Sequence, residues 1–152
     1  MNLKQKQFID TFIGMPLVYV NLLLAKTLGR LLKRNHGLDK APDEIVFIKI
    51  LGFGSVLIAS DSIYSIKLAH PGSRISIICS RGIYPGIESL KLFDRIYIIE
   101  DGSLMSTVFS TLNILSKLWK LKNKWIVDLE VYSKLTSILS LWTMAINRFG
   151  FY

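Results

Sequence analysis

The segment Ile45–Ser60, with the sequence IVFIKILGFGSVLIAS, constrains the fold of this chain more than any other. It opens with four apolar residues, mostly β-branched, which is typical of a strand buried on both faces of a parallel sheet. A glycine turn follows, and Ser55 is a good N-cap for the helix predicted next. Ligands of open α/β sheets bind at the carboxyl ends of such strands, so we expect Lys49–Ser55 to form one wall of any site.

The rest of the chain repeats this order of strand and helix. The expected strands are 45–50, 74–79, 95–99, 125–129 and the start of a fifth at Arg148. The expected helices are 55–69, a short one within 80–92, 104–119 and 131–145. Helical spacing predicts buried faces made by Val56, Ala59, Ile63 and Ile66 and by Val108, Leu112, Leu115 and Trp119. The alternation predicts an α/β domain with a parallel sheet and right-handed crossovers.

Composition narrows the class of protein. A chain of 152 residues can bury a core, and 51% apolar with 20% charged residues excludes a disordered composition. The mean hydropathy of +0.40 indicates a membrane surface or an absent partner surface. The single cysteine, Cys79, excludes an intramolecular disulfide, and we expect it to be a small buried residue. His36 and His70 lack the spacing of metal ligands, so no metal is expected.

The segment 1–40 differs from the rest, with seven Lys/Arg against two Asp. Its apolar run, 8–25, is interrupted by Asp10, Pro16 and Asn21, so it is a poor transmembrane span, and no cleavage site follows it. A helix is expected to start near Pro16. Its apolar positions are Leu17, Val20, Leu24, Leu28, Leu31 and Leu32, and its basic carboxyl end holds Lys26, Arg30, Lys33 and Arg34. This amphipathic pattern predicts a helix lying on an anionic membrane surface; packing on the domain or on another protein is the alternative.

The net charge of +8 fits anionic lipid headgroups, phosphorylated sugars or nucleic acid. No nucleic-acid-binding motif accompanies the charge, so we do not expect a nucleic-acid partner. Four lysines, Lys117, Lys120, Lys122 and Lys124, form either a solvated helix end or a patch for an acidic ligand.

Four segments together resemble one family. They are IVFIKILGFGSVLIAS (45–60), HPGSRISIIC (70–79), WIVDLEVYSKLTSILSLWTMAINRFGFY (125–152) and the leading FIDTFIGMPLVYVNLLL (8–24). Their order and spacing resemble the N-terminal domain of glycosyltransferase family nine, the heptosyltransferase family of lipopolysaccharide assembly. The likeness covers nearly the whole chain.

The resemblance implies a Rossmann-like domain at 44–152, one half of a GT-B fold, preceded by the 1–40 segment. In that family this half binds a lipid-linked acceptor sugar, a C-terminal half binds the nucleotide-sugar donor, and transfer needs no metal or other cofactor. The expected location is the cytoplasmic, inner face of the cell membrane. The donor-binding half is absent here, so we expect a second chain to supply it or, in a truncated product, little activity.

The resemblance also points to a departure at the catalytic position. The family's proposed base, an aspartate after the glycine turn, is Ser55 here, and an alcohol without a nearby base cannot accept a proton at neutral pH. Asp61, in the following helix, is expected to be a surface charge. Asp128 and Glu130 fall on one face at the end of the fourth strand and are the candidate catalytic residues. Their alternative roles are a helix cap for Asp128 and a first-turn acid for Glu130.

The candidate substrate-binding residues lie at the same edge: Lys49, Gly52, Gly54, Ser55, Ser133 and Lys134. Lys49 could hold a phosphate or sugar oxygen, or only snorkel at the sheet edge. The two glycines could admit a ligand close to the backbone, with helix amides from Val56 onward as anion donors, or could serve the turn alone. Ser133 and Lys134 match a polar pair of the family and could reach the acceptor.

Two other classes of function remain open. A non-catalytic module that binds a glycan or a partner enzyme is favoured by Ser55. A dinucleotide-binding domain is weaker, because the third glycine of the fingerprint and the acid after the second strand are both missing.

Overall fold

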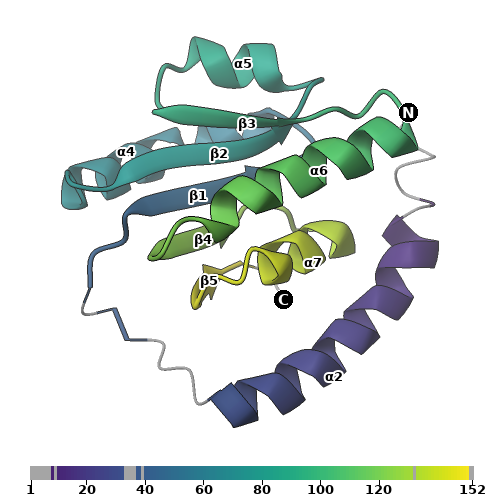
Figure 1. Cartoon of the computed structure of the whole chain (residues 1–152). Coiled ribbons are helices and arrows are strands. Elements are labelled where there is room, and N and C mark those ends of the chain that lie inside the picture. Colours follow the sequence, from purple (N-terminus) through teal and green to yellow (C-terminus); the bar gives the residue numbers. More distant parts are fainter. Residues whose placement is uncertain (1–7, 9, 33–36, 39, 132, 151–152) are drawn as a thin grey trace.

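The computed structural model describes residues 8, 10–32, 37–38, 40–131 and 133–150, which form a parallel sheet covered by helices on both faces (Figure 1). The five strands run in the order β3-β2-β1-β4-β5, and every pairing is parallel. The strands are β1 (Glu44–Lys49), β2 (Arg74–Ser80), β3 (Arg95–Ile99), β4 (Lys124–Asp128) and β5 (Asn147–Phe149). The helices are η1 (Asp10–Gly14), α2 (Met15–Leu32), α3 (Gly54–Ile58), α4 (Ser60–Ala69), α5 (Tyr84–Ser89), α6 (Leu104–Trp119) and α7 (Lys134–Trp142).

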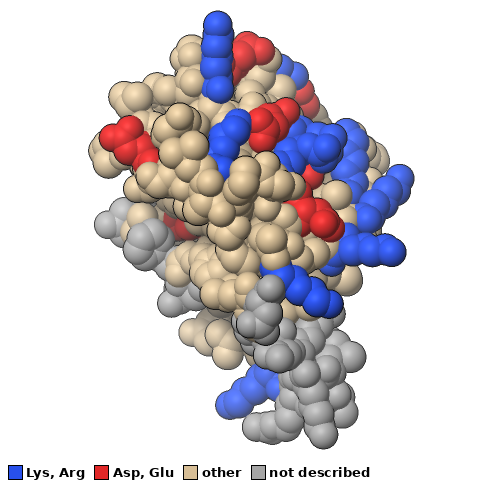
Figure 2. Space-filling view, turned by 90° about the vertical axis from the view of Figure 1, so that its left-hand side faces the viewer, with Lys and Arg blue, Asp and Glu red and all other residues tan. Residues whose placement is uncertain are grey.

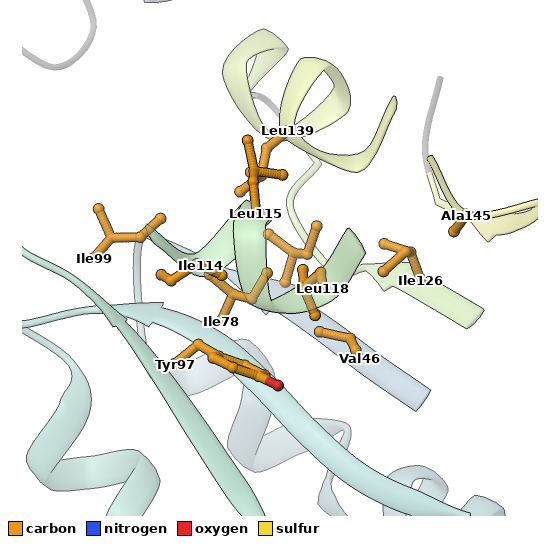
Figure 3. Close-up of a cluster of buried hydrophobic side chains, with 11 residues drawn as sticks. Val46, Ile78, Tyr97, Ile99, Ile114, Leu115, Leu118, Ile126, Leu139 and Ala145 are labelled. Atoms are coloured by element: carbon orange, nitrogen blue, oxygen red, sulfur yellow. The ribbon is translucent and has the colours of Figure 1, made fainter. Parts of the chain in front are cut away.

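The central strand, β1, is buried over its whole length because helices cover both of its faces. Val46 and Ile48 belong to a core that includes residues of α6 and α7 (Figure 3), whereas Phe47 belongs to a second core that includes residues of α3, α4 and α5. The predicted α/β class and all five predicted strands are therefore confirmed. Cys79 is fully buried as predicted, and burial raises the pKa of its thiol to about 12.

The sequence predicted one continuous helix over 55–69, and this prediction is wrong. The chain instead forms α3 and α4, separated at Ala59. Ser55 is also not the N-cap: Phe53 holds that position with helical backbone angles, and no side chain caps the helix. The reason is the positive φ of Gly52, +75°, which completes the turn early so that the helix starts at Gly54.

The predicted buried face of α6 is wrong for three of its four residues. Val108, Leu112 and Trp119 are 45–49% exposed, and only Leu115 of the predicted set is buried. The residues that face the sheet are Ile114, Leu115 and Leu118. The helix is apolar around most of its circumference, so hydrophobic spacing alone could not select the side that packs.

The last helix, α7, is shorter than the predicted 131–145. It begins only at Lys134, after a turn that Asp128 forms by accepting a hydrogen bond from the Glu130 amide. It ends before Met144, which takes a left-handed conformation (φ 58°) typical of the residue after a helix. Neither Asp128 as a cap of this helix nor Glu130 as its first-turn acid is therefore correct.

The N-terminal helix, α2, contacts α7 on the side of the sheet that α6 and α7 cover (Figure 1). Its Tyr19, Leu22 and Leu23 side chains are 62–72% exposed. The structure describes no side chain for the predicted Leu24, Leu28, Arg30, Leu31 and Leu32, and Lys33 and Arg34 lie outside the described residues. Within the described ranges, no helix is long and apolar enough to cross a membrane.

At the amino edge of the sheet, Glu44 is a fully buried carboxylate, which was not predicted from the sequence. It accepts hydrogen bonds from Ser76 Oγ (2.5 Å) and Tyr97 OH (3.0 Å) and pairs with Arg74 Nη1 (3.3 Å).

Figure 2 views the molecule from the left of Figure 1, where β1 begins. It shows Lys and Arg side chains gathered on its right-hand side, which is the side that faces the viewer in Figure 1.

Candidate functional site

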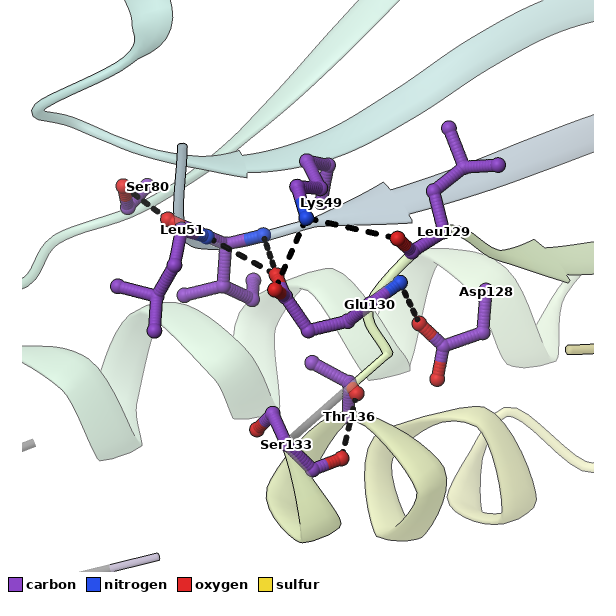
Figure 4. Close-up of polar contacts among 9 residues, drawn as sticks. Lys49, Leu51, Ser80, Asp128, Leu129, Glu130, Ser133 and Thr136 are labelled. Carbon is purple, nitrogen blue, oxygen red and sulfur yellow. Dashed lines mark hydrogen bonds and ion pairs between the residues drawn. The ribbon is translucent and has the colours of Figure 1, made fainter. Parts of the chain in front are cut away.

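The predicted residues Lys49, Asp128 and Glu130 come together at the carboxyl edge of the sheet (Figure 4). β1 and β4 are parallel neighbours, and Ile48 lies opposite Asp128 in their register. Lys49 ends β1, and Glu130 follows the end of β4 by two residues. The edge where open α/β sheets bind ligands thus carries three charged groups.

Lys49 and Glu130 form a buried ion pair, with 2.9 Å between Lys49 Nζ and Glu130 Oε1 and side chains only 7% and 8% exposed. The other carboxylate oxygen accepts the backbone amides of Ile50 (3.1 Å) and Leu51 (3.0 Å). Lys49 Nζ also donates to the carbonyl of Leu129 at 3.4 Å. We call this arrangement the Lys49–Glu130 clamp. It ties the loop after β1 to the end of β4 and occupies both Glu130 oxygens.

The carboxyl group of Asp128 differs from that of Glu130 in its hydrogen bonding. It is 2% exposed, and its Oδ1 accepts the Glu130 amide at 2.9 Å. Its Oδ2 is buried and has no hydrogen-bond partner in the described part of the chain. Burial, the largest cause, raises the pKa of Asp128 to about 6, against the opposing effects of the Glu130 amide and the Thr136 hydroxyl. Asp128 is therefore a buried carboxyl group with one oxygen outside the hydrogen-bond geometry of its neighbours, with Thr136 beside it, and with a pKa suited to proton transfer near neutral pH.

Two hydroxyl residues at this edge were not predicted. Ser80 Oγ, at the end of β2, donates to the Ile50 carbonyl at 2.7 Å and so holds the loop after β1 from its other side. Thr136, in the first turn of α7, donates to the Ser133 carbonyl at 2.9 Å and lies beside Asp128. The position of Ser80 at a strand end was the one signal that could have found it.

The predicted polar pair, Ser133 and Lys134, occupies the start of α7, beside this site. Ser133 is the N-cap residue of that helix, although its side chain makes no capping hydrogen bond. Lys134 is the first helical residue and is half-buried. Their predicted contact with an acceptor stays a prediction.

The glycine turn presents an open surface at the same edge. Gly52 and Gly54 have no atom within 4 Å of the position that a Cβ would take, and Ser55 is exposed. The predicted role of the helix amides is wrong for Val56, whose amide donates to the Phe53 carbonyl at 2.9 Å. Asp61 is an exposed residue in the first turn of α4, as predicted.

The described residues contain no cluster of side chains that could bind a metal ion. Nowhere in them do three His, Cys, Asp or Glu side chains lie close enough to hold a metal ion together. The arrangement at the carboxyl edge can accept a proton at Asp128, whereas the hydroxyl groups of Ser80 and Thr136 are buried and donate to backbone carbonyls.

The sequence matches no protein-family model and no curated protein. Among solved structures, the chain is similar to the glycosyl transferase family 9 protein from Veillonella parvula DSM 2008, with 14% sequence identity and a TM-score of 0.62. The match covers 78% of this chain and 34% of that protein.

A structural similarity at 14% sequence identity establishes the fold and nothing more specific. The chain has a Rossmann-like α/β fold similar to that of GT-B glycosyltransferases, and it spans about a third of the length of the Veillonella protein.

Proposed function

We propose that this chain is the acceptor-binding half of a heptosyltransferase-like glycosyltransferase. The fold likeness supports the class of enzyme. The observation that carries a chemical role is the buried Asp128, with its raised pKa and its unpartnered oxygen at the ligand-binding edge of the sheet.

In the proposed reaction a hydroxyl of the acceptor attacks the anomeric carbon of a nucleotide-sugar. A new carbon–oxygen bond forms, the bond from that carbon to the phosphate oxygen breaks, and the nucleoside diphosphate leaves with the bonding electrons. The hydroxyl proton passes to Asp128 Oδ2. A base with a pKa near 6 is largely ionised at pH 7 and accepts a proton more readily than an ordinary carboxylate.

Glu130 is less suited to this role, because both of its oxygens already accept hydrogen bonds and one of them pairs with Lys49. Neither oxygen is therefore free to receive the proton of an acceptor hydroxyl. We therefore assign Glu130 and Lys49 to holding the loop after β1, and Asp128 to proton transfer. Because Asp128 is only 2% exposed, its surroundings have to rearrange when the acceptor binds.

The proposed substrates are those that the resemblance to glycosyltransferase family nine implies. The acceptor is a lipid-linked saccharide of the cell envelope, as in lipopolysaccharide synthesis, and the donor is a nucleotide-sugar bound by a donor-binding half of the kind found in that family. No metal or other cofactor takes part. A lipid-linked acceptor places the protein at the cytoplasmic face of the cell membrane, where the basic 1–40 segment meets anionic lipid. This chain alone is expected to transfer no sugar.

The test combines this chain with a donor-binding half, beginning with any second α/β domain encoded beside it, and measures release of nucleoside diphosphate in the presence of a lipid-linked saccharide. Asp128→Asn should lower turnover by about 10²-fold or more, the usual contribution of a general base. The matched control, Asp61→Asn, removes an exposed carboxylate of α4 and should leave turnover unchanged. Full turnover in Asp128→Asn, or transfer by this chain alone, would refute the proposal.

A non-catalytic glycan- or partner-binding module is the second candidate. It is favoured by Ser55 at the position of the family's base and by the occupied oxygens of Glu130. A saccharide that binds equally to the wild type and to Asp128→Asn, with no turnover under any combination, would favour this module over the enzyme.

A further inference from the structure

The outer face of α6 carries an exposed row of large apolar side chains. They recur at helical spacing over the first half of the helix, and each is 45–67% exposed. We call them the α6 stripe: Leu104, Met105, Val108, Phe109 and Leu112. Trp119 extends the exposed apolar surface near the carboxyl end of the same helix.

This stripe is not needed for the core. The sheet-facing side of α6 is complete without it, since Ile114, Leu115 and Leu118 are each at most 4% exposed. Spacings of one, four, five and eight residues from Leu104 place the five side chains together on one side of a helix. Monomeric proteins rarely expose a contiguous apolar surface of this kind unless it contacts a partner or a membrane.

The charges around the stripe favour an anionic lipid surface. α6 contains no Asp or Glu. Glu100 and Asp101 precede the stripe, and Glu100 is paired with Arg81, whereas the carboxyl end of α6 is followed by exposed lysines at Lys120 and Lys122. Lys and Arg side chains gather on the side of the molecule that faces the viewer in Figure 1, where α6 lies. Apolar side chains that enter the acyl boundary, next to lysines that meet anionic headgroups, are the two features of an interfacial helix.

The geometry of α6 fits a helix that lies in the membrane plane. Its 16 residues span about 24 Å, which is shorter than the hydrocarbon core of a bilayer. It lies on the outside of the sheet, on the side that faces the viewer in Figure 1.

We propose that the α6 stripe docks on the interface of an anionic bilayer, with Lys120 and Lys122 against the lipid headgroups. This surface is independent of the catalytic role proposed above and of the N-terminal helix.

The test is flotation of the full chain with vesicles of phosphatidylcholine containing about a third phosphatidylglycerol, compared with phosphatidylcholine alone. Met105→Ser with Phe109→Ser should lower the partition coefficient by about tenfold or more, given the apolar area that leaves the membrane. The matched control is Tyr64→Ser with Leu68→Ser, an equally spaced exposed apolar pair on α4, across the sheet. This control should partition like the wild type.

Two further measurements separate the alternatives. Lys120→Gln with Lys122→Gln should weaken partition onto anionic vesicles and leave the small binding to neutral vesicles unchanged. Circular dichroism and urea unfolding check that each variant is folded. Wild-type partition by the Met105/Phe109 variant would overturn the proposal. A wild-type dimer in light scattering that this variant converts to monomer would also overturn it, because a second copy would then cover the stripe.

Discussion

The Lys49–Glu130 clamp makes the sharpest prediction about stability. Glu130→Gln preserves the size of the side chain but replaces one acceptor oxygen with an NH₂ group. If the remaining oxygen faces the amides of Ile50 and Leu51, the NH₂ group faces Lys49 Nζ; the flipped amide places the NH₂ group against the two backbone donors. In both orientations donors meet, and the Lys49 ammonium stays buried without a counter-charge.

The expected loss follows from this geometry. Removing one member of a buried ion pair costs about 3–5 kcal/mol, because the other charge is left uncompensated. The native state of a typical domain is favoured by only about 5–15 kcal/mol, so the loss is a large share of the total. Urea unfolding monitored by far-ultraviolet circular dichroism measures it directly. Glu100→Gln, which removes an exposed partner of Arg81, is the control and should change the midpoint little.

The double variant Lys49→Met with Glu130→Gln tests the mechanism itself. With the ammonium gone, the Gln oxygen can accept the Ile50 and Leu51 amides while its NH₂ group no longer faces a cation. The double variant should therefore lose less stability than the sum of the two single variants, with a coupling energy of about 1–3 kcal/mol. Additive losses, or a cost below about 1 kcal/mol for Glu130→Gln alone, would refute the clamp.

Two further substitutions test the same edge of the sheet. The pKa of Asp128 in the folded protein, about 6, lies above the ordinary value of 3.8, so this group lowers stability as the pH rises from about 4 to about 6. Asp128→Asn should remove that slope and raise the free energy of unfolding at pH 7.5 by at most about 3 kcal/mol, measured by urea unfolding across this pH range; an unchanged slope would contradict it. Gly52→Ala should cost about 1–2 kcal/mol because φ is +75° there, whereas Gly54→Ala, with open space and a negative φ, should cost little; equal thermal midpoints would argue against the strained turn.

The sheet could be predicted because the hydrophobic pattern of its strands is compatible with few other structures. A run such as Ile45–Ile48, apolar on both faces and followed by a glycine turn, fits a buried parallel strand and little else. The faces of the helices were less predictable. In α6 the apolar residues surround most of the helix, and the side that packs depends on where β1 and β4 place the sheet.

The site was predictable only as a location. Lys49 and Asp128 were predicted because each lies at the end of a strand. Glu130 was predicted because side chains alternate along a strand, which puts it on the same face as Asp128. The sequence could not reveal that Lys49 and Glu130 neutralise each other, since they are 81 residues apart and meet only through the parallel register of β1 and β4. Ser80 and Thr136 were missed because single hydroxyl residues carry no periodic signal. Glu44 was missed because an acid before an apolar run is usually exposed.

The parallel pairing of β1 with β4 also has a consequence for biosynthesis. Ile45 and Trp125 are direct partners although they lie 80 residues apart, so β1 leaves the ribosome long before its second neighbour is made. During that interval β1, β2 and β3 can pair, but one edge of β1 stays open with its amide and carbonyl groups unpaired. Such an edge recruits other strands, so a nascent chain stalled before Lys124 should be prone to aggregation and dependent on chaperones.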